Sequence, residues 1–174
     1  MILDIARLFV FPALLAFAAA SDLLTMTISN RISLALVAGY YVLALAGGAS
    51  GAEIMAHSAA GVAVLAIAFS LFAMGWIGGG DAKLAAATAL WFGFGDLLAY
   101  VLYASIFGGL LTLALIWFGL WSLPSFLEAQ PWARRLHERT AGIPYGVALA
   151  AAALVIYPNT AWIKAIVFSR LAIG

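Results

Sequence analysis

Residues 54–80 read IMAHSAAGVAVLAIAFSLFAMGWIGGG and are followed directly by Asp81. These 27 residues contain no Asp, Glu, Lys or Arg. An α-helix needs about 20 consecutive apolar residues to cross the hydrocarbon core of a bilayer. The stretch therefore predicts a transmembrane helix, and it places the chain among the membrane proteins.

The rest of the chain has the same character. Of its 174 residues 67% are hydrophobic and only 9% are charged, and its mean hydropathy is +1.14, whereas a soluble domain carries about 25% charged residues. We predict an all-α polytopic membrane protein in which residues 1–174 form a single transmembrane domain. Its uncharged stretches predict about six transmembrane helices, at residues 3–20, 32–47, 54–75, 81–94, 97–121 and 142–157.

Three segments need a separate interpretation. Residues 122–141 are predicted to form the one long polar loop, and residues 158–174 an interfacial tail. Arg7, the apolar run after it and the small residues 18–21 imitate a cleavable signal peptide. Asp4 in the charged region and Asp22 just after the apparent cleavage site favour a retained helix instead.

Helix parity places Asp22 and Asp81 at the same membrane face, because two predicted helices lie between them. Asp96 follows one further crossing and falls at the opposite face. The opposite loops, at 48–53 and 95–96, contain no Lys or Arg. The loops on the side of Asp22 and Asp81 contain five cations: Arg31, Lys83, Arg134, Arg135 and Arg139. The positive-inside rule then predicts that this face is cytoplasmic, with the N-terminus outside. Lys164 and Arg170 would lie outside, so the placement of the tail stays open.

Several kinds of chemistry are excluded or disfavoured. The chain has no cysteine, so it lacks disulfides, thiolate metal sites and a cysteine nucleophile. A net charge of +1 does not supply the basic surface of a nucleic-acid-binding protein. The glycines at 78–80 lack the spacing of a phosphate-binding loop. His57 and Glu53, four residues apart, could form a metal-ligand pair or a proton relay, but a hydrogen-bonded pair at the membrane interface is the simpler interpretation.

Asp22 and Asp81 are the candidate catalytic residues. Ionisable groups at membrane depth are costly, and those that persist usually form pairs or have a function. Gly78, Gly79 and Gly80 precede Asp81, and glycines permit positive φ angles and the close approach of another chain, such as a peptide substrate. Two adjacent carboxylates share a proton more easily than they both ionise, so one can act as a base.

Structural interpretations of the same residues remain open at this point. Asp22 could be an ordinary residue at the end of a helix, and Asp81 could cap the helix that follows the glycines. Asp96 is predicted to cap the next helix, because Gly95-Asp96 precedes an apolar run. The cluster from Arg134 to Arg139 is predicted to meet anionic lipid head groups.

Three segments occur in order along the chain: SDLLTMTISN at residues 21–30, GGGDAKL at residues 78–84 and IPYG at residues 143–146. Together they resemble the type IV prepilin peptidases, which are GxGD-type intramembrane aspartyl proteases. The resemblance is closest to the short, peptidase-only branch that serves tight-adherence (Flp-type) pili. It covers most of the chain, from the first predicted helix to the last.

The resemblance implies that Asp22 and Asp81 are catalytic and that Gly78, Gly79, Gly80, Lys83 and Asn30 support the two motifs. It implies a prepilin substrate whose short basic leader is cut at the cytoplasmic face of the bacterial inner membrane, with no metal or cofactor. Ser29 stands where the family usually has a proline. Longer members also carry a cysteine-rich zinc domain and methylate the new N-terminus, so a chain without cysteine is expected to lack methyltransferase activity.

Two other functions compete with the protease. In a small proton-coupled transporter or channel, Asp22 and Asp81 would relay protons between helices. In a non-catalytic assembly subunit, the glycines would serve close helix packing. Membrane lipid is an expected partner in each case, and the oligomeric state and the identity of the pilin stay open.

Overall fold

The computed structural model describes residues 1–138 and 142–171, and every regular element in these ranges is a helix. The elements are α1 (Ile2–Thr25), α2 (Asn30–Ala46), α3 (Gly51–Ala73), α4 (Gly79–Phe118), α5 (Ser125–Glu128), α6 (Pro131–His137), α7 (Tyr145–Ile156), η1 (Tyr157–Asn159) and α8 (Ala161–Leu171). The prediction of an all-α protein is confirmed.

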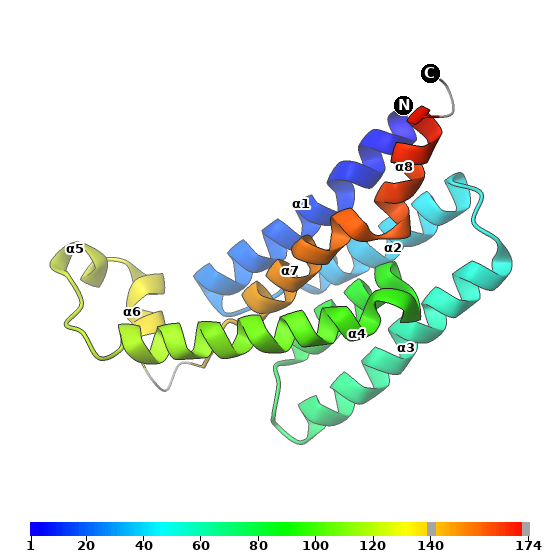
Figure 1. Cartoon of the computed structure of the whole chain (residues 1–174). Coiled ribbons are helices and arrows are strands. Elements are labelled where there is room, and N and C mark those ends of the chain that lie inside the picture. Colours follow the sequence, from blue (N-terminus) through cyan, green and yellow to red (C-terminus); the bar gives the residue numbers. More distant parts are fainter. Residues whose placement is uncertain (139–141, 172–174) are drawn as a thin grey trace.

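Within the described ranges, four stretches are long and apolar enough to span a membrane, namely α1, α3, α4 and the run Tyr145–Ile166. The apolar helix α2 is shorter, and α4 has 40 residues with a break at Gly93 that divides it into two arms. The chain therefore passes along the bundle about six times, as predicted. Figure 1 shows the N-terminus and the C-terminal helix α8 at the same end of the molecule, which an even number of passes requires.

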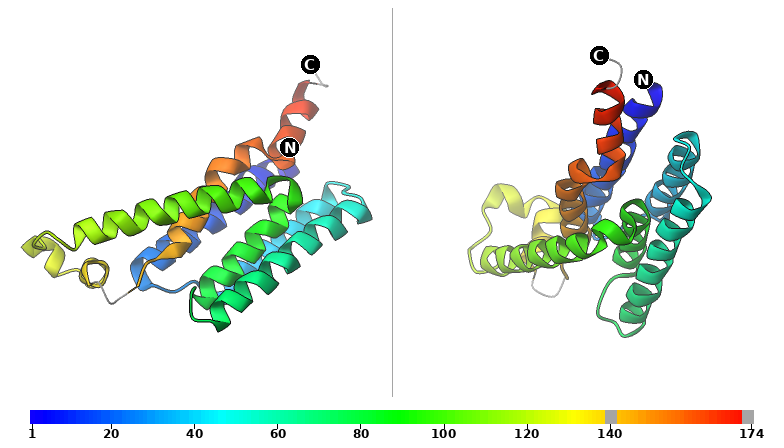
Figure 2. Two further views of the ribbon diagram at one scale, coloured as in Figure 1. Left: turned by 60° about the horizontal axis from the view of Figure 1, so that its bottom comes forward. Right: turned by 45° about the vertical axis from the view of Figure 1, so that its right-hand side comes forward.

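The break in α4 is the main difference from the predicted boundaries. We expected two helices, at 81–94 and 97–121, with Asp96 as the cap between them. Instead the backbone turns at Gly93, where φ is 60° and ψ is −169°, a conformation that is open almost only to glycine. Asp96 lies in the first turn of the second arm rather than before it. The helix turns sharply here, and Figure 2 shows the two arms leaving the break at a large angle to each other.

Two side chains complete the hydrogen bonding at this break. A broken helix leaves carbonyl groups in its last turn without backbone partners. Nδ1 of His57 lies 2.9 Å from the carbonyl oxygen of Leu90, and Nε1 of Trp162 donates to the carbonyl oxygen of Trp91 at 2.9 Å. The expected hydrogen bond between His57 and Glu53 is not formed. Glu53 instead forms a capping box with Ser50 at the start of α3.

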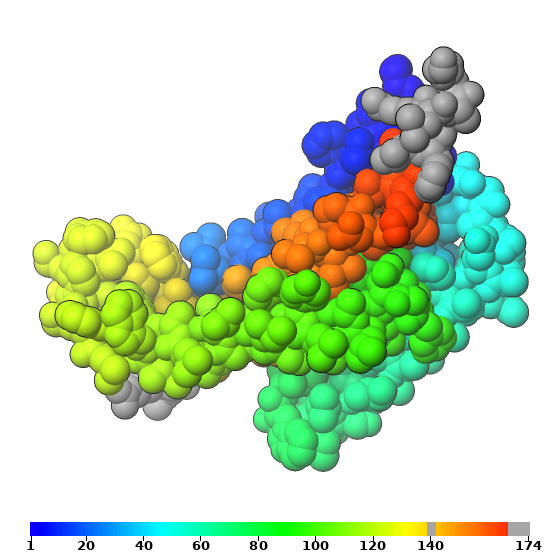
Figure 3. All heavy atoms as spheres, viewed as in Figure 1, coloured from blue at the N-terminus to red at the C-terminus, as the bar shows by residue number. Residues whose placement is uncertain are grey.

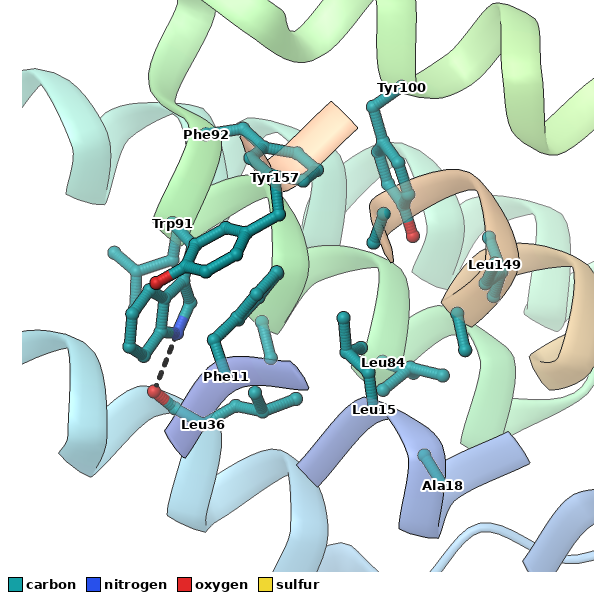
Figure 4. Packing of buried hydrophobic residues seen from close by; sticks show 14 of the residues in the cluster. Phe11, Leu15, Ala18, Leu36, Leu84, Trp91, Phe92, Tyr100, Leu149 and Tyr157 are labelled. Carbon is teal, nitrogen blue, oxygen red and sulfur yellow. Dashed lines mark hydrogen bonds between the residues drawn. The ribbon is translucent and has the colours of Figure 1, made fainter. Parts of the chain in front are cut away.

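An aromatic cluster holds the first arm of α4 against its neighbours. Trp91 is fully buried, lies 4.7 Å from the ring of Phe11 in α1, and donates its indole N–H to the carbonyl oxygen of Leu36 in α2 at 2.9 Å. Tyr157, beyond α7, packs against Phe11 at 4.5 Å and against Trp91 at 6.3 Å between ring centres. Figure 4 shows these rings between helices that are far apart in the sequence. The cluster therefore fixes α1, α2 and α7 around the first arm of α4.

The break predicts a selective effect of substitution. A Cβ atom at Gly93 would lie 2.8 Å from Nε2 of His57, and the φ of Gly93 is unfavourable for any other residue. We expect Gly93→Ala to destabilise the protein by about 2 kcal/mol or more, measured as a lower melting temperature of the purified protein in detergent. Gly95→Ala is the matched control, because nothing lies within 4 Å of a Cβ at Gly95. Equal melting temperatures for both variants would contradict this account of the break.

The segment predicted as a polar loop contains the two short helices α5 and α6. It projects at the end of the molecule away from both termini, in yellow in Figure 3. Arg135 ties it to α1, because its Nη1 donates to the carbonyl oxygen of Leu24 at 3.1 Å. Arg139 of the predicted basic cluster lies outside the described residues. The first part of the predicted tail forms η1 and α8, and its position at the membrane interface stays a prediction.

Candidate active site

Asp22 lies in the last turn of α1, which ends where Met26 adopts a left-handed conformation with φ of 55°. The side chain is 5% exposed, and its Oδ2 accepts a hydrogen bond from the backbone N–H of Gly146 at 2.8 Å. Gly146 is the second residue of α7, so its N–H belongs to the first turn of that helix, where backbone N–H groups lack partners within the helix. The start of α7 thus binds the carboxyl group at the end of α1.

Asp81 lies in the first turn of α4 and is half-buried. Its carboxyl group interacts with the backbone of Gly78 and Gly146 and with the charge of Asp22. The structure therefore brings two acidic residues that are 59 positions apart in the sequence to one cleft, which is also lined by Tyr145 at the start of α7. The predicted proximity of Asp22 and Asp81 matches this arrangement.

Both carboxyl groups open into one cleft of about 1020 Å³. The apolar part of its lining comes from the α3–α4 connection and the second arm of α4, and includes Trp76, Ile77, Leu115 and Ile116. The polar part comes from the end of α6, and includes His137 and Glu138. A peptide with an apolar segment on one side of its reacting bond and a charged segment on the other would match this lining.

The three glycines before Asp81 allow other side chains to lie close to the backbone at the start of α4. A Cβ at Gly78 would lie 2.9 Å from Oδ2 of Asp81, and one at Gly80 would lie 3.2 Å from Cβ of Ile28. Gly79 faces the ring of Phe72 instead. Contrary to one expectation, none of the three has a positive φ. Of the three, only Gly78 lines the cleft.

Lys83 and Asn30, the other two predicted support residues, lie outside the cleft. Nζ of Lys83 donates to Oδ1 of Asn30 at 2.9 Å, which joins the first turn of α4 to the first turn of α2. Ser29 accepts a hydrogen bond from the N–H of Arg31 at 3.3 Å as the N-cap of α2. A hydroxyl therefore caps the helix at the position where the prepilin peptidases that the sequence resembles usually have proline.

Sequence reasoning did not identify Gly146 and Tyr145 as site residues. The hydroxyl of Tyr145 donates to the carbonyl oxygen of Ala104 at 3.2 Å, and its ring packs directly on Gly108, so the start of α7 is attached to the second arm of α4. A Cβ at Gly146 would meet both Ile28 and Asp22. A signal was available, because Ile143-Pro144-Tyr145-Gly146 opens a helix, and N–H groups in the first turn of a helix attract carboxylates.

Two facing carboxyl groups suit hydrolysis of an amide bond. When two carboxyl groups lie close together and partly buried, one can hold a proton while the other accepts one. The protonated group can polarise a carbonyl oxygen, while the ionised group takes a proton from a water molecule. Among the described residues, no cluster of three or more His, Asp or Glu side chains could hold a metal ion.

Comparison with known proteins gives one result. The sequence model of the type IV leader peptidase family matches residues 9–113, a range that contains Asp22, Asp81 and the second arm of α4 as far as the cleft. The chain has no significant match among curated proteins or among solved structures.

Proposed function

Because the chain belongs to the type IV leader peptidase family, we propose that it is an aspartyl endopeptidase in which Asp22 and Asp81 form the catalytic dyad. The membership implies a protease that acts on prepilins. The dyad rests on one observation above all: the carboxyl groups from α1 and α4 meet at the first turn of α7 inside a single cleft.

In the proposed reaction the dyad shares one proton. The protonated carboxyl group donates a hydrogen bond to the scissile carbonyl, and the ionised group removes a proton from the attacking water. The tetrahedral intermediate then collapses, and the leaving nitrogen takes up a proton from the dyad. Because the two groups titrate as a pair, the base is a property of the dyad rather than of one residue.

The proposed substrate is the precursor of a type IV pilin of the Flp type, cut between a short basic leader and an apolar helix. Both sides of such a bond have a counterpart in the cleft lining, with Glu138 for the leader and the apolar residues around Trp76 for the helix. We further propose that cleavage occurs at the cytoplasmic face of the bacterial inner membrane. The mature N-terminus is expected to remain unmethylated.

The test is cleavage of a prepilin by the full chain purified in detergent. Intact-mass measurement of the products should show one cut that separates the leader from the mature pilin, with no added methyl group. A proton-coupled transporter would leave the prepilin intact and would acidify proteoliposomes in a substrate-dependent manner. That pair of results would overturn the proposal.

The proposed orientation predicts a labelling pattern. The loop cations on the Asp22 and Asp81 side support the proposal that residues 122–141 face the cytoplasm, by the positive-inside rule. Ser125 and Ser50 are exposed and belong to the loop regions at opposite ends of the bundle, and each can be changed to cysteine in a chain that has none. A membrane-impermeant maleimide should label intact cells at position 50 and not at 125. The reverse pattern would place the active site outside.

A further inference from the structure

A second hollow lies on the other side of the first arm of α4. It has a volume of about 470 Å³ and is bordered by α2, α3 and the first arm of α4. Helices α2 and α3 diverge from the loop that joins them, with the first arm of α4 beside both (Figures 1 and 2). Its middle is lined mainly by apolar and small residues, among them Leu34, Val37, Gly61 and Val62. None of these residues takes part in the proposed dyad.

A hydrogen-bonded pair marks each end of this groove. At one end Lys83 donates to Asn30 at 2.9 Å. At the other end the hydroxyl of Tyr41 and Oγ of Ser58 lie 2.9 Å apart and join α2 to α3. From Asn30 to Tyr41 the groove follows twelve residues of α2, which corresponds to about 16 Å of helix. This length is about half of the 30 Å hydrocarbon core, or the depth of one leaflet.

The dimensions favour an acyl chain over a peptide helix. A peptide helix is about 10 Å wide with its side chains, and the hydrogen bond of 2.9 Å between Tyr41 and Ser58 leaves no opening of that width between α2 and α3 at that end of the groove. An acyl chain is narrower, needs no hydrogen-bond partners along its length and matches an apolar lining. The pair of Tyr41 and Ser58 would then lie near the midplane, where the chain ends.

The charge at the open end favours an anionic head group. Lys83 is exposed, and Asn30 takes only one of its three N–H donors. Within the described part of the chain no carboxylate forms a salt bridge with Lys83, and none lines the groove. Arg31, the next residue of α2, adds a second cation at this end. A phosphate diester would meet two cations here, whereas the basic leader of a prepilin would be repelled.

We propose that this groove is a binding site for one anionic phospholipid, with an acyl chain between α2 and α3 and the phosphate at Lys83. The site is separate from the dyad and is independent of proteolysis. An occupied groove would fill the space between α2 and α3, next to the arm that carries Asp81.

The experiment counts lipids bound to the full chain by native mass spectrometry from detergent, with phosphatidylglycerol and phosphatidylcholine of identical acyl chains. We expect one molecule of phosphatidylglycerol to bind about fivefold more tightly than phosphatidylcholine, since one cation near a membrane surface contributes roughly that factor. Lys83→Gln should weaken this preference, with Arg31 as the remaining cation, and Lys83→Arg should keep it in full. Lys164→Gln, which makes the same charge change in α8, should have no effect.

A second variant tests the acyl chain. Val62 lines the groove and is 66% exposed, so Val62→Trp fills the space without entering the packing of α3 on α4. This variant should bind both lipids about fivefold or more weakly, at an unchanged melting temperature. If Lys83→Gln does not fold, Val62→Trp alone tests whether the groove binds lipid. Equal binding of the two lipids by the unaltered chain would overturn the proposal. Displacement of phosphatidylglycerol by a peptide of the apolar pilin helix would overturn it too, by making the groove a peptide site.

Discussion

Asp22→Asn and Asp81→Asn should each reduce prepilin cleavage by about a thousandfold or more at unchanged expression. Asparagine keeps the shape of the side chain but can neither hold nor accept the shared proton, and such a loss corresponds to about 4 kcal/mol of transition-state stabilisation. The initial rate of leader release by the purified protein is the measurement. The same variants should keep the melting temperature of the unaltered protein to within a few degrees.

Asp96→Asn and Glu53→Gln are the matched controls. The break at Gly93 lies about 18 Å from Asp81 along the first arm of α4, and Asp96 comes after the break. Glu53 caps α3 at the same end of the bundle as the break. Loss of the capping bond of Glu53 costs about 1 kcal/mol, which is too little to abolish activity in a folded protein, and Asp96 lies in the first turn of the second arm, remote from the cleft. Both variants should therefore retain most of the cleavage rate. If all four variants failed alike, general destabilisation would replace the dyad as the explanation.

Gly146→Ala should reduce cleavage by about a hundredfold. A Cβ at this position would lie 2.5 Å from Cδ1 of Ile28 and 2.8 Å from Oδ2 of Asp22, so the carboxyl group and the start of α7 cannot both keep their positions. A displacement of about 1 Å in a catalytic group is enough for a loss of this size. The cleavage rate at saturating prepilin is the measurement, because the defect lies in the chemical step rather than in binding.

Gly109→Ala is the control for this prediction. Gly109 lies inside the second arm of α4, and nothing comes within 4 Å of a Cβ built on it. Replacing an exposed glycine within a helix by alanine stabilises the helix by up to about 1 kcal/mol, so this variant should cleave at the rate of the unaltered chain. Full activity of Gly146→Ala would mean that the contact between Gly146 and Asp22 has no role in catalysis.

The number of passes and the position of Asp22 and Asp81 at the same end of the bundle could be predicted from the sequence. Both follow from counting the uncharged stretches along the chain. Uncharged stretches separated by charges identify the helices, and parity then assigns each aspartate to a face. The Gly78-Gly79-Gly80 run before Asp81 identified the start of α4 for a similar reason, since a run of glycines can hardly lie inside a stable helix.

The position of the break in α4 could not be predicted in this way. Gly93 and Gly95 lie two residues apart, and the pair Gly95-Asp96 resembles a helix cap more closely than Gly93 does. The choice between the glycines depends on packing, because His57 from α3 and Trp162 from α8 supply donors to the carbonyl groups that the break exposes. The sequence analysis noted the segment that contains Gly146 but did not predict its role, since that role depends on a contact across 124 residues of sequence.

The central claim is that Asp22 and Asp81 act as one unit, and a double-mutant cycle on kcat/KM tests it most directly. Residues that share one catalytic step are strongly non-additive, so removal of the second adds little once the first is lost. We predict that the double variant with Asp22→Asn and Asp81→Asn cleaves prepilin within about threefold of the slower single variant. Losses that multiplied in the double variant would show that the two carboxyl groups act independently, and would contradict the dyad.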